Sequence, residues 1–501
     1  MNCSLSMAVD ETISPPQTGR LSVFSLFFLS ILGYILIGFW FPLQPQIYHP
    51  PPADIRTFAP TLLGGLLFAF LVSGLFAIHL ALYRRAKDFD FGSRPLALIL
   101  LGVVFFAVPL LVAYPINATD IFRYALHGRV TAVYGDNPYV NTPAEYVGDP
   151  FLPLADEWAN DISPYGPLWE IVAAGLTAAG GEHLTGTILL LKGFALTCFL
   201  ASTVLIWSLL PAGPSRPAHT LLWAWNPGLL MIFVLDGHND ALMILWLLAG
   251  QWLWRRGRPQ AGFLVMMLAV LTKPIALLAL PFFAIGILRE FANGKEQVRF
   301  VAVSLIGGFL LAWLAFLPWS GSGPLLAGPA NLVSRLAQEA TASAGFSPSV
   351  WLYMLLGQQV PFGSIGNLSR GLFLVFVVFL IWLALRGRSP LRGVADSFLG
   401  YVAAALSFRI WYAAWPFAWL LLDAGAEKAD GNSRWAGYRL RAGWWFLLLS
   451  QLSVVIYGHV RVSVLGGDQV MAHLIGVPVV FVLPWVLAAL PVDRTVDDAA
   501  A

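Results

Sequence analysis

Side chains that can accept a proton or bind an anion gather in two short stretches of the 501-residue sequence. NATDIFRYALHGRV (117–130) carries one Asp, two Arg and one His between two apolar regions, and DGHND (236–240) carries two Asp and one His. Polar groups at membrane depth are costly, so such clusters are candidate functional sites. The motifs GxxxxGKS, GxGxxG and HExxH do not occur, which gives no support to nucleotide coupling or zinc hydrolysis.

Four further segments add polar and aromatic side chains to this set. They are GDNPYV (135–140), SPYGPLWE (163–170), TKP (272–274) and FRIWYAAWP (408–416). From all six segments we single out as candidate site residues Asp120, Arg123, Tyr124, Asn137, Tyr165, His238, Asn239, Asp240, Lys273, Arg409, Trp411, Tyr412 and Trp415.

The elements that must position these residues are membrane helices. Hydrophobic residues make up 58% of the chain and charged residues 11%, and the mean hydropathy is +0.73. Runs without charge, such as 21–43, 61–83 and 470–490, are long enough to cross a bilayer. We expect an all-α polytopic protein of roughly 12–14 transmembrane helices, some short and paired as hairpins. It would comprise an inner tail (1–20), one membrane domain (21–491) and a second inner tail (492–501), with the first run retained.

Basic residues predict the orientation. Most of the 29 Lys and Arg residues fall into loops on one side, which the positive-inside rule assigns to the cytoplasm together with both termini. The loops 116–165 and 319–346 then lie outside, and the first carries juxtamembrane helices. Two apolar segments, 261–288 and 394–422, are interrupted by TKP and FRIWYAAWP, so each is expected to form a hairpin whose tip reaches the outer side. All six candidate segments therefore share the outer face.

Each of these residues also has a purely structural interpretation. Asp120 could cap a helix beginning at Ile121, and Asn239 or Asp240 could cap the helix that follows. Lys273 could extend to the membrane interface. The Trp and Tyr residues of FRIWYAAWP could belong to an aromatic belt. Lys192, inside a predicted helix, is either a buried pairing partner or part of a path for lipid phosphate.

The six segments, in this order and with WNPGLL before DGHND, resemble bacterial polyprenol-phosphate-mannose-dependent alpha-(1->6)-mannosyltransferases. These enzymes belong to the GT-C class of integral-membrane glycosyltransferases. The likeness runs from about Leu96 to Leu422. An acidic residue in the first outer loop is common to the whole class, whereas the ordered combination is more specific. The chain departs from the simplest members, which place that loop after the first helix, because here two predicted crossings precede the helix that leads to Asp120.

This resemblance implies a GT-C-like bundle that transfers a hexose, mannose above all, from a polyprenyl phosphate to a glycan or glycolipid hydroxyl with inversion. Asp120, at the family's motif position, would be the general base, since the acceptor must lose a proton near a positively charged sugar ring. The leaving phosphate needs positive charge, for which Lys273, Arg409, Arg123 and His238 are the candidates. We expect sugar or acceptor contacts from Asn239, Asp240, Tyr124, Asn137 and Tyr165, and a lipid slot from Trp411, Tyr412 and Trp415.

Under this interpretation the protein needs no cofactor and no metal, although Asp120 and Asp240 could share a divalent ion. Its partners would be the lipid-linked donor, the acceptor and membrane lipids of a bacterial plasma membrane, with no nucleic acid. Two other functions stay open. A flippase for lipid-linked sugars would show matching broken helices in two halves, and a ligase or polymerase of lipid-linked glycans would carry a longer late outer loop.

Overall fold

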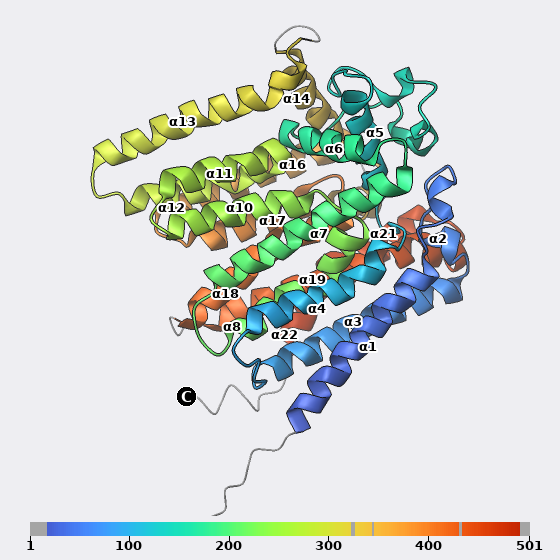
Figure 1. Ribbon diagram of the computed structural model, residues 1–501, viewed down its shortest axis with the longest axis horizontal. Helices are drawn as coiled ribbons and strands as arrows, with labels where there is room; N and C mark the ends of the chain where they lie inside the picture. Colours follow the sequence, from blue (N-terminus) through green and yellow to red (C-terminus); the bar gives the residue numbers. More distant parts are fainter. Residues whose placement is uncertain (1–17, 322–325, 343–344, 430–432, 491–501) are drawn as a thin grey trace, which may run out of the picture.

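The computed structural model describes residues 18–321, 326–342, 345–429 and 433–490, and these form helices and loops without a β-strand. The α-helices are α1 (Thr18–Trp40), α2 (Ile55–Phe58), α3 (Leu62–Ala86), α4 (Pro95–Leu111), α5 (Asp120–Ala132), α6 (Pro167–Gly180), α7 (Leu184–Leu209), α8 (Arg216–Ala224), α9 (Pro227–Leu230), α10 (Asp240–Arg255), α11 (Pro259–Thr272), α12 (Leu280–Glu290), α13 (Gly294–Phe316), α14 (Ala327–Glu339), α15 (Pro348–Leu355), α16 (Phe362–Leu385), α17 (Pro390–Ala404), α18 (Ala414–Ala429), α19 (Ser433–Val455), α20 (Arg461–Ser463), α21 (Gln469–Phe481) and α22 (Leu483–Ala489). Figure 1 shows most of the long helices running in similar directions as one bundle.

Length and apolar composition identify the helices that can cross a membrane. Within the described ranges seven helical segments qualify, and the bent pair Arg216–Ala224 and Pro227–Leu235 would make an eighth. Two shorter apolar helices, α4 and α11, add to these. The prediction of an all-α polytopic protein is confirmed, whereas the expected 12–14 crossings exceed the number of long helices and stay a prediction.

Both interrupted segments fold as helical hairpins, as predicted. The first is α11, an extended residue at Lys273, the 3₁₀ turn η6 (Pro274–Leu278) and α12. The second is α17, a loop, the 3₁₀ turn η8 (Ile410–Ala413) and α18. Proline explains the first break, because Pro274 has no backbone N–H and disfavours helical geometry at the residue before it.

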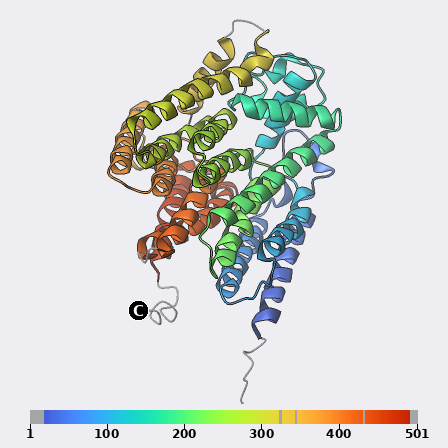
Figure 2. The same ribbon diagram turned by 60° about the vertical axis from the view of Figure 1, so that its left-hand side comes forward.

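The two segments predicted to be outer loops meet at one end of the bundle. Figures 1 and 2 show α5 and α6 beside α14 at this end. Asn331 donates to the carbonyl of Tyr139 (2.9 Å), and the indole of Trp319 donates to the Thr131 hydroxyl (3.1 Å). These bonds join segments nearly two hundred residues apart in the chain. The late loop therefore packs on the first one.

Lys192, whose role the sequence left open, is a buried pairing partner. Its side chain is inaccessible to solvent, and its ammonium donates to the carbonyls of Leu110 (2.9 Å) and Leu111 (3.1 Å) and to that of Ala113. These carbonyls lie at the end of α4, where the helix dipole favours a cation. Lys192 therefore anchors the end of α4 and does not line a lipid path.

A buried ion pair stabilises the first loop, and its loss is predicted to be costly. Arg129 donates to Asp149 (2.6 Å) with both side chains buried, whereas its second partner, Glu182, is 66% exposed. We expect Arg129→Met to cost about 3 kcal/mol, because the buried Asp149 carboxylate loses its ion-pair partner and keeps only the hydrogen bonds from the Tyr134 hydroxyl and the Phe151 backbone. Glu182→Gln, the matched control, should cost under about 1 kcal/mol. Thermal unfolding of the detergent-solubilised variants measures both, and equal melting temperatures would contradict the prediction.

Candidate active site

A cavity of about 930 Å³ opens where the first loop, the late loop and the two hairpin tips meet. Six basic side chains and four acidic ones line it, together with a wall of aromatic rings. The charged residues are Asp54, Arg56, Asp120, Arg123, Asp161, Lys273, Arg335, Glu339, Arg370 and Arg409. This volume suits a ligand of moderate size, and the excess of positive charge suits an anion.

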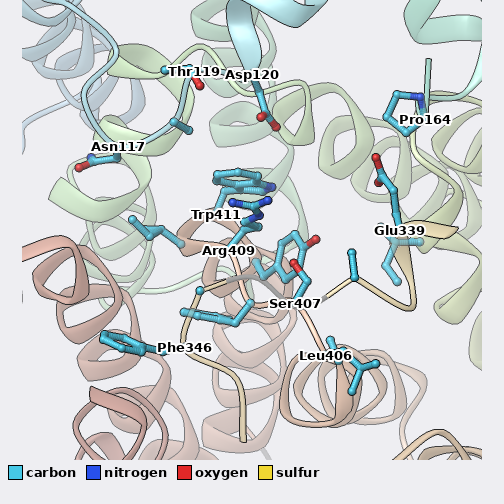
Figure 3. A pocket seen from close by; sticks show the side chains of 18 of the residues that line it. Asn117, Thr119, Asp120, Pro164, Glu339, Phe346, Leu406, Ser407, Arg409 and Trp411 are labelled. Atoms are coloured by element: carbon cyan, nitrogen blue, oxygen red, sulfur yellow. The ribbon is translucent and has the colours of Figure 1, made fainter. Parts of the chain in front are cut away.

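Asp120 lies in the first turn of α5 and faces this cavity. Thr119, not Asp120, takes the N-cap position, so the capping interpretation of Asp120 is wrong. The Tyr165 hydroxyl donates to Asp120 Oδ2 (3.3 Å). In Figure 3 the Asp120 carboxylate points toward the side chains of Trp411 and Arg409. Its carboxylate is thus available to a molecule in the cavity.

Among the cations that line the cavity, Arg409 has the fewest contacts with the described residues. It precedes η8 in an extended conformation and is exposed to the cavity. Within the part of the chain that the structure describes, its guanidinium has neither a hydrogen bond nor an ion pair. A planar guanidinium with free N–H groups can grip a phosphate through two parallel bonds.

Lys273 also lines the cavity, but a carboxylate already holds it. Its ammonium donates to both oxygens of Asp240 (3.0 and 2.8 Å) and to Asn239 Oδ1 (3.3 Å). Its side chain is only 13% exposed. Lys273 therefore does not extend to the membrane interface, and it presents a partly compensated charge to the cavity.

Arg123 faces the cavity from α5 and contacts the late loop. Its guanidinium lies 3.4 Å from Glu339 and 3.7 Å from Asp161, and it approaches the Tyr165 ring (5.7 Å to the centroid). Arg335 in turn binds Asp161 through two bonds of 2.7 and 2.6 Å. The late loop, through α14, thus completes one wall of the site.

Three rings of the second hairpin tip line the cavity. Trp411 and Trp415 are 8% and 2% exposed, too buried for an aromatic belt at the membrane interface. Tyr412 stacks on Trp415 with centroids 4.1 Å apart. The rings therefore form a wall of the cavity, where they can contact an isoprenoid chain or a sugar face.

The remaining predicted residues do not line the cavity. Behind its wall, fully or almost fully buried, lie Tyr124, His238, Asn239 and Asp240. The predicted direct contacts of these residues with phosphate or sugar are therefore not supported by their positions. Asn239 takes the N-cap position of α10 but makes no capping bond with its side chain. Asn137 accepts from the backbone of Tyr139 within the first loop, and the structure does not bring it to the site.

Several lining residues were missed by sequence reasoning. Arg335 and Glu339 are spaced one helical turn apart on α14 and pair with each other (3.1 Å), a signal that was readable as an i,i+4 pair. Asp161 lies in the first loop without a recognisable motif. Arg370 is the only charged residue of α16, and that isolation within an apolar helix was a usable signal.

A divalent ion shared by Asp120 and Asp240 finds little support in this arrangement. Across the described ranges no group of three His, Cys, Asp or Glu side chains is placed to hold an ion. Asp240, the second of the two ligands, already accepts from Lys273 and from the indole of Trp415. Sharing a divalent ion with Asp120 would require both bonds to break.

The protonation of Asp120 predicts a pH dependence. Burial raises the pKa of the Asp120 carboxyl above its ordinary value, while Lys273, Arg409 and Arg123 oppose the rise. Below that pKa the carboxyl is protonated and cannot accept a proton, so activity that depends on this base falls on acidification. We expect the acidic limb of the pH profile to lie above the value of about 3.9 typical of a free Asp. A limb at or below that value would contradict the assignment.

Comparison with known proteins gives one family. A family model described as the N-terminal domain of alpha-(1->6)-mannopyranosyltransferases matches residues 27–289. An alpha-(1->6)-mannopyranosyltransferase A of Mycobacterium tuberculosis is 29% identical over 363 residues, which are 66% of this chain and 67% of the relative. A probable alpha-(1->6)-mannopyranosyltransferase of Mycolicibacterium smegmatis is 26% identical over 357 residues, which are 62% of this chain and 63% of the relative. The match therefore spans somewhat less than two thirds of that relative's length. No solved structure gives a significant match.

Proposed function

The chain belongs to the alpha-(1->6)-mannopyranosyltransferase family, and from this premise we propose that it is a multi-pass membrane enzyme that transfers mannose from a polyprenyl phosphate to a hydroxyl of a glycan or glycolipid. The relatives' names support the sugar and the class of reaction. The lipid-linked donor, the outer face of a bacterial plasma membrane as the location and the cytoplasmic termini are parts of the proposal.

The mechanism we propose is a single displacement with inversion. Asp120 accepts the proton of the acceptor hydroxyl as that oxygen attacks the anomeric carbon. The bond between the anomeric carbon and the phosphate oxygen breaks, and the polyprenyl phosphate leaves as a monoester. Arg409, with Lys273 and Arg123 nearby, stabilises the charge that develops on this phosphate. Trp411, Tyr412 and Trp415 contact the isoprenoid or the sugar.

One observation carries this proposal: the Asp120 carboxylate and the Arg409 guanidinium line the same cavity. The guanidinium forms no ion pair or hydrogen bond with a described residue. A base alone would serve many hydrolases, and a guanidinium alone would bind many anions. Together they suit a reaction that removes a proton from one substrate and releases a phosphate from the other.

The donor proposal is tested with purified protein in lipid nanodiscs. Polyprenyl-phosphate mannose, polyprenyl-phosphate glucose and GDP-mannose are offered in parallel with an alpha-linked oligomannoside acceptor, with and without chelator. We expect transfer from the first donor only and no loss with chelator. Transfer from GDP-mannose would overturn the lipid-donor proposal. Joining of preassembled glycans would favour the ligase, and movement of lipid-linked sugar across proteoliposomes without transfer would favour the flippase.

A further inference from the structure

The DGHND loop (236–240) is buried, yet it contacts both sides of the cavity. It leads into α10, and Asp236, His238, Asn239 and Asp240 are each at most 2% exposed. None of them lines the cavity. Buried carboxylates are costly unless they are paired and hydrogen-bonded, so their partners indicate what the loop does.

Asp240 holds the phosphate side of the site. Its carboxylate accepts from the Lys273 ammonium at the first hairpin tip and from the Trp415 indole at the second. Two hairpins more than a hundred residues apart in the chain therefore meet on one carboxylate. Because both partners line the cavity, Asp240 fixes where they face.

Asp236 and the middle of the loop hold the base side. Asp236 accepts from the backbone N–H of Asn117 (3.3 Å), in the segment that leads to Asp120. Gly237 has a φ of +69°, and a Cβ there would lie 2.5 Å from Ile121, the residue after Asp120. The loop thus packs directly on the first turn of α5, in a left-handed backbone conformation that glycine adopts without strain.

His238 joins the two sides. Its ring lies 4.2 Å from the Trp411 ring, and its Nδ1 lies 3.4 Å from the Tyr124 hydroxyl and 3.6 Å from Asp240. Tyr124 is on α5, one turn after Asp120, whereas Trp411 is at the second hairpin tip. A chain of contacts therefore runs from the base to the cations through this loop.

We infer that the DGHND loop is the positioning element of the reacting centre: Asp240 sets the place of the Lys273 ammonium and the Trp415 indole, and Asp236 with Gly237 sets the first turn of α5 that carries Asp120. This inference rests on the proposed function. It reassigns Asn239 and Asp240 from sugar contacts to the support of lining residues. Small misplacements of reacting groups reduce turnover strongly, so a positioning role has a kinetic signature.

The test compares Asp240→Asn, Lys273→Met and the double variant with Asp423→Asn. Asp423 is an equally buried carboxylate that pairs with Arg439 (3.3 Å) and Arg392 (3.2 Å), and it does not line the cavity. It therefore controls for the loss of a buried ion pair. Mannose transfer from polyprenyl-phosphate mannose is measured as kcat, donor KM and the pH profile of kcat/KM.

We expect Asp240→Asn to lower kcat about tenfold or more with a donor KM within about threefold of wild type. The titratable and charged groups that interact electrostatically with Asp120 are Lys273, Arg409, Arg123, Tyr165, Asp240, Asp236, Tyr124 and Tyr412. Loss of the Asp240 charge should move the acidic limb to lower pH, and loss of the Lys273 charge should move it to higher pH, so the double variant should lie between them. Asp423→Asn should leave kcat and the limb unchanged.

Other results would overturn the inference. An Asp240→Asn variant with an unchanged or raised kcat would show that Asp240 has no positioning role. A higher donor KM, with the acidic limb of the pH profile at its wild-type position, would make Asp240 a binding group or a merely structural one. If Asp240→Asn fails to accumulate, the comparison of Lys273→Met with Lys273→Arg decides. We expect only Lys273→Arg to return the acidic limb of the pH profile to its wild-type position. Equal limbs in the two Lys273 variants would overturn the inference. A fully active Asp120→Asn would instead overturn the proposed function and leave these contacts to be explained separately.

Discussion

Asp120→Asn is expected to lower kcat by at least about a hundredfold while donor binding changes little. The amide has almost the shape of the carboxylate and can keep the contact with Tyr165, but it cannot accept the acceptor's proton. Lost general-base catalysis typically costs between about a hundredfold and ten-thousandfold. Mannose transfer by matched amounts of folded protein in nanodiscs measures the effect, with donor binding determined in parallel.

Asp136→Asn is the matched control for this substitution. Asp136 lies in the same loop and accepts from the Tyr146 hydroxyl (2.6 Å), but it does not line the cavity. It should therefore keep nearly the wild-type kcat. If the two asparagine variants lost activity equally, the loop would be sensitive to any charge loss, and Asp120 would have no special role.

Arg409→Gln should give the second large loss, about a hundredfold to a thousandfold in kcat/KM. This is the range seen when a preorganised group that stabilises developing negative charge is removed. The loss should exceed that of Lys273→Met, because Lys273 is already paired with Asp240 and Arg409 is not paired within the described residues. Steady-state transfer and binding of polyprenyl phosphate measure both variants.

Two comparisons sharpen this prediction. Arg409→Lys should recover only part of the activity, because an ammonium is a point charge and cannot form two parallel bonds to phosphate. Arg299→Gln on α13 removes a guanidinium that does not line the cavity and should be silent. If Lys273→Met were the more damaging variant, the phosphate would bind at the first hairpin tip instead.

The hairpins show what the sequence could predict about the fold. Charge-free runs identify membrane helices, and a proline beside Lys273 identifies a break, because both effects are local. The distribution of basic residues then predicts that the two tips share one face, and both tips do line one cavity. The long helices alone do not determine the number of crossings, since several helices that pack in the bundle are short.

The site was predictable only for residues whose accessibility follows from local pattern. Asp120, Lys273, Arg409, Trp411 and Trp415 all line the cavity, as a shared face implied. The predicted exposure of Asp240 to the cavity was wrong, because Asp240 is buried by two hairpins that pack over it from distant parts of the chain. Arg335 and Glu339 were readable as an i,i+4 pair, but their contacts with the first loop are tertiary and could not be predicted from that spacing.

The central claim, inverting transfer from a lipid phosphate with Asp120 as the base, is tested most directly by the configuration of the product. Purified wild-type protein and Asp120→Asn are given polyprenyl-phosphate mannose of one defined anomeric configuration, and the new glycosidic bond is assigned by NMR. The account predicts a product of opposite configuration from wild type and almost none from the variant. A product of retained configuration, or the same product from an active Asp120→Asn, would contradict it.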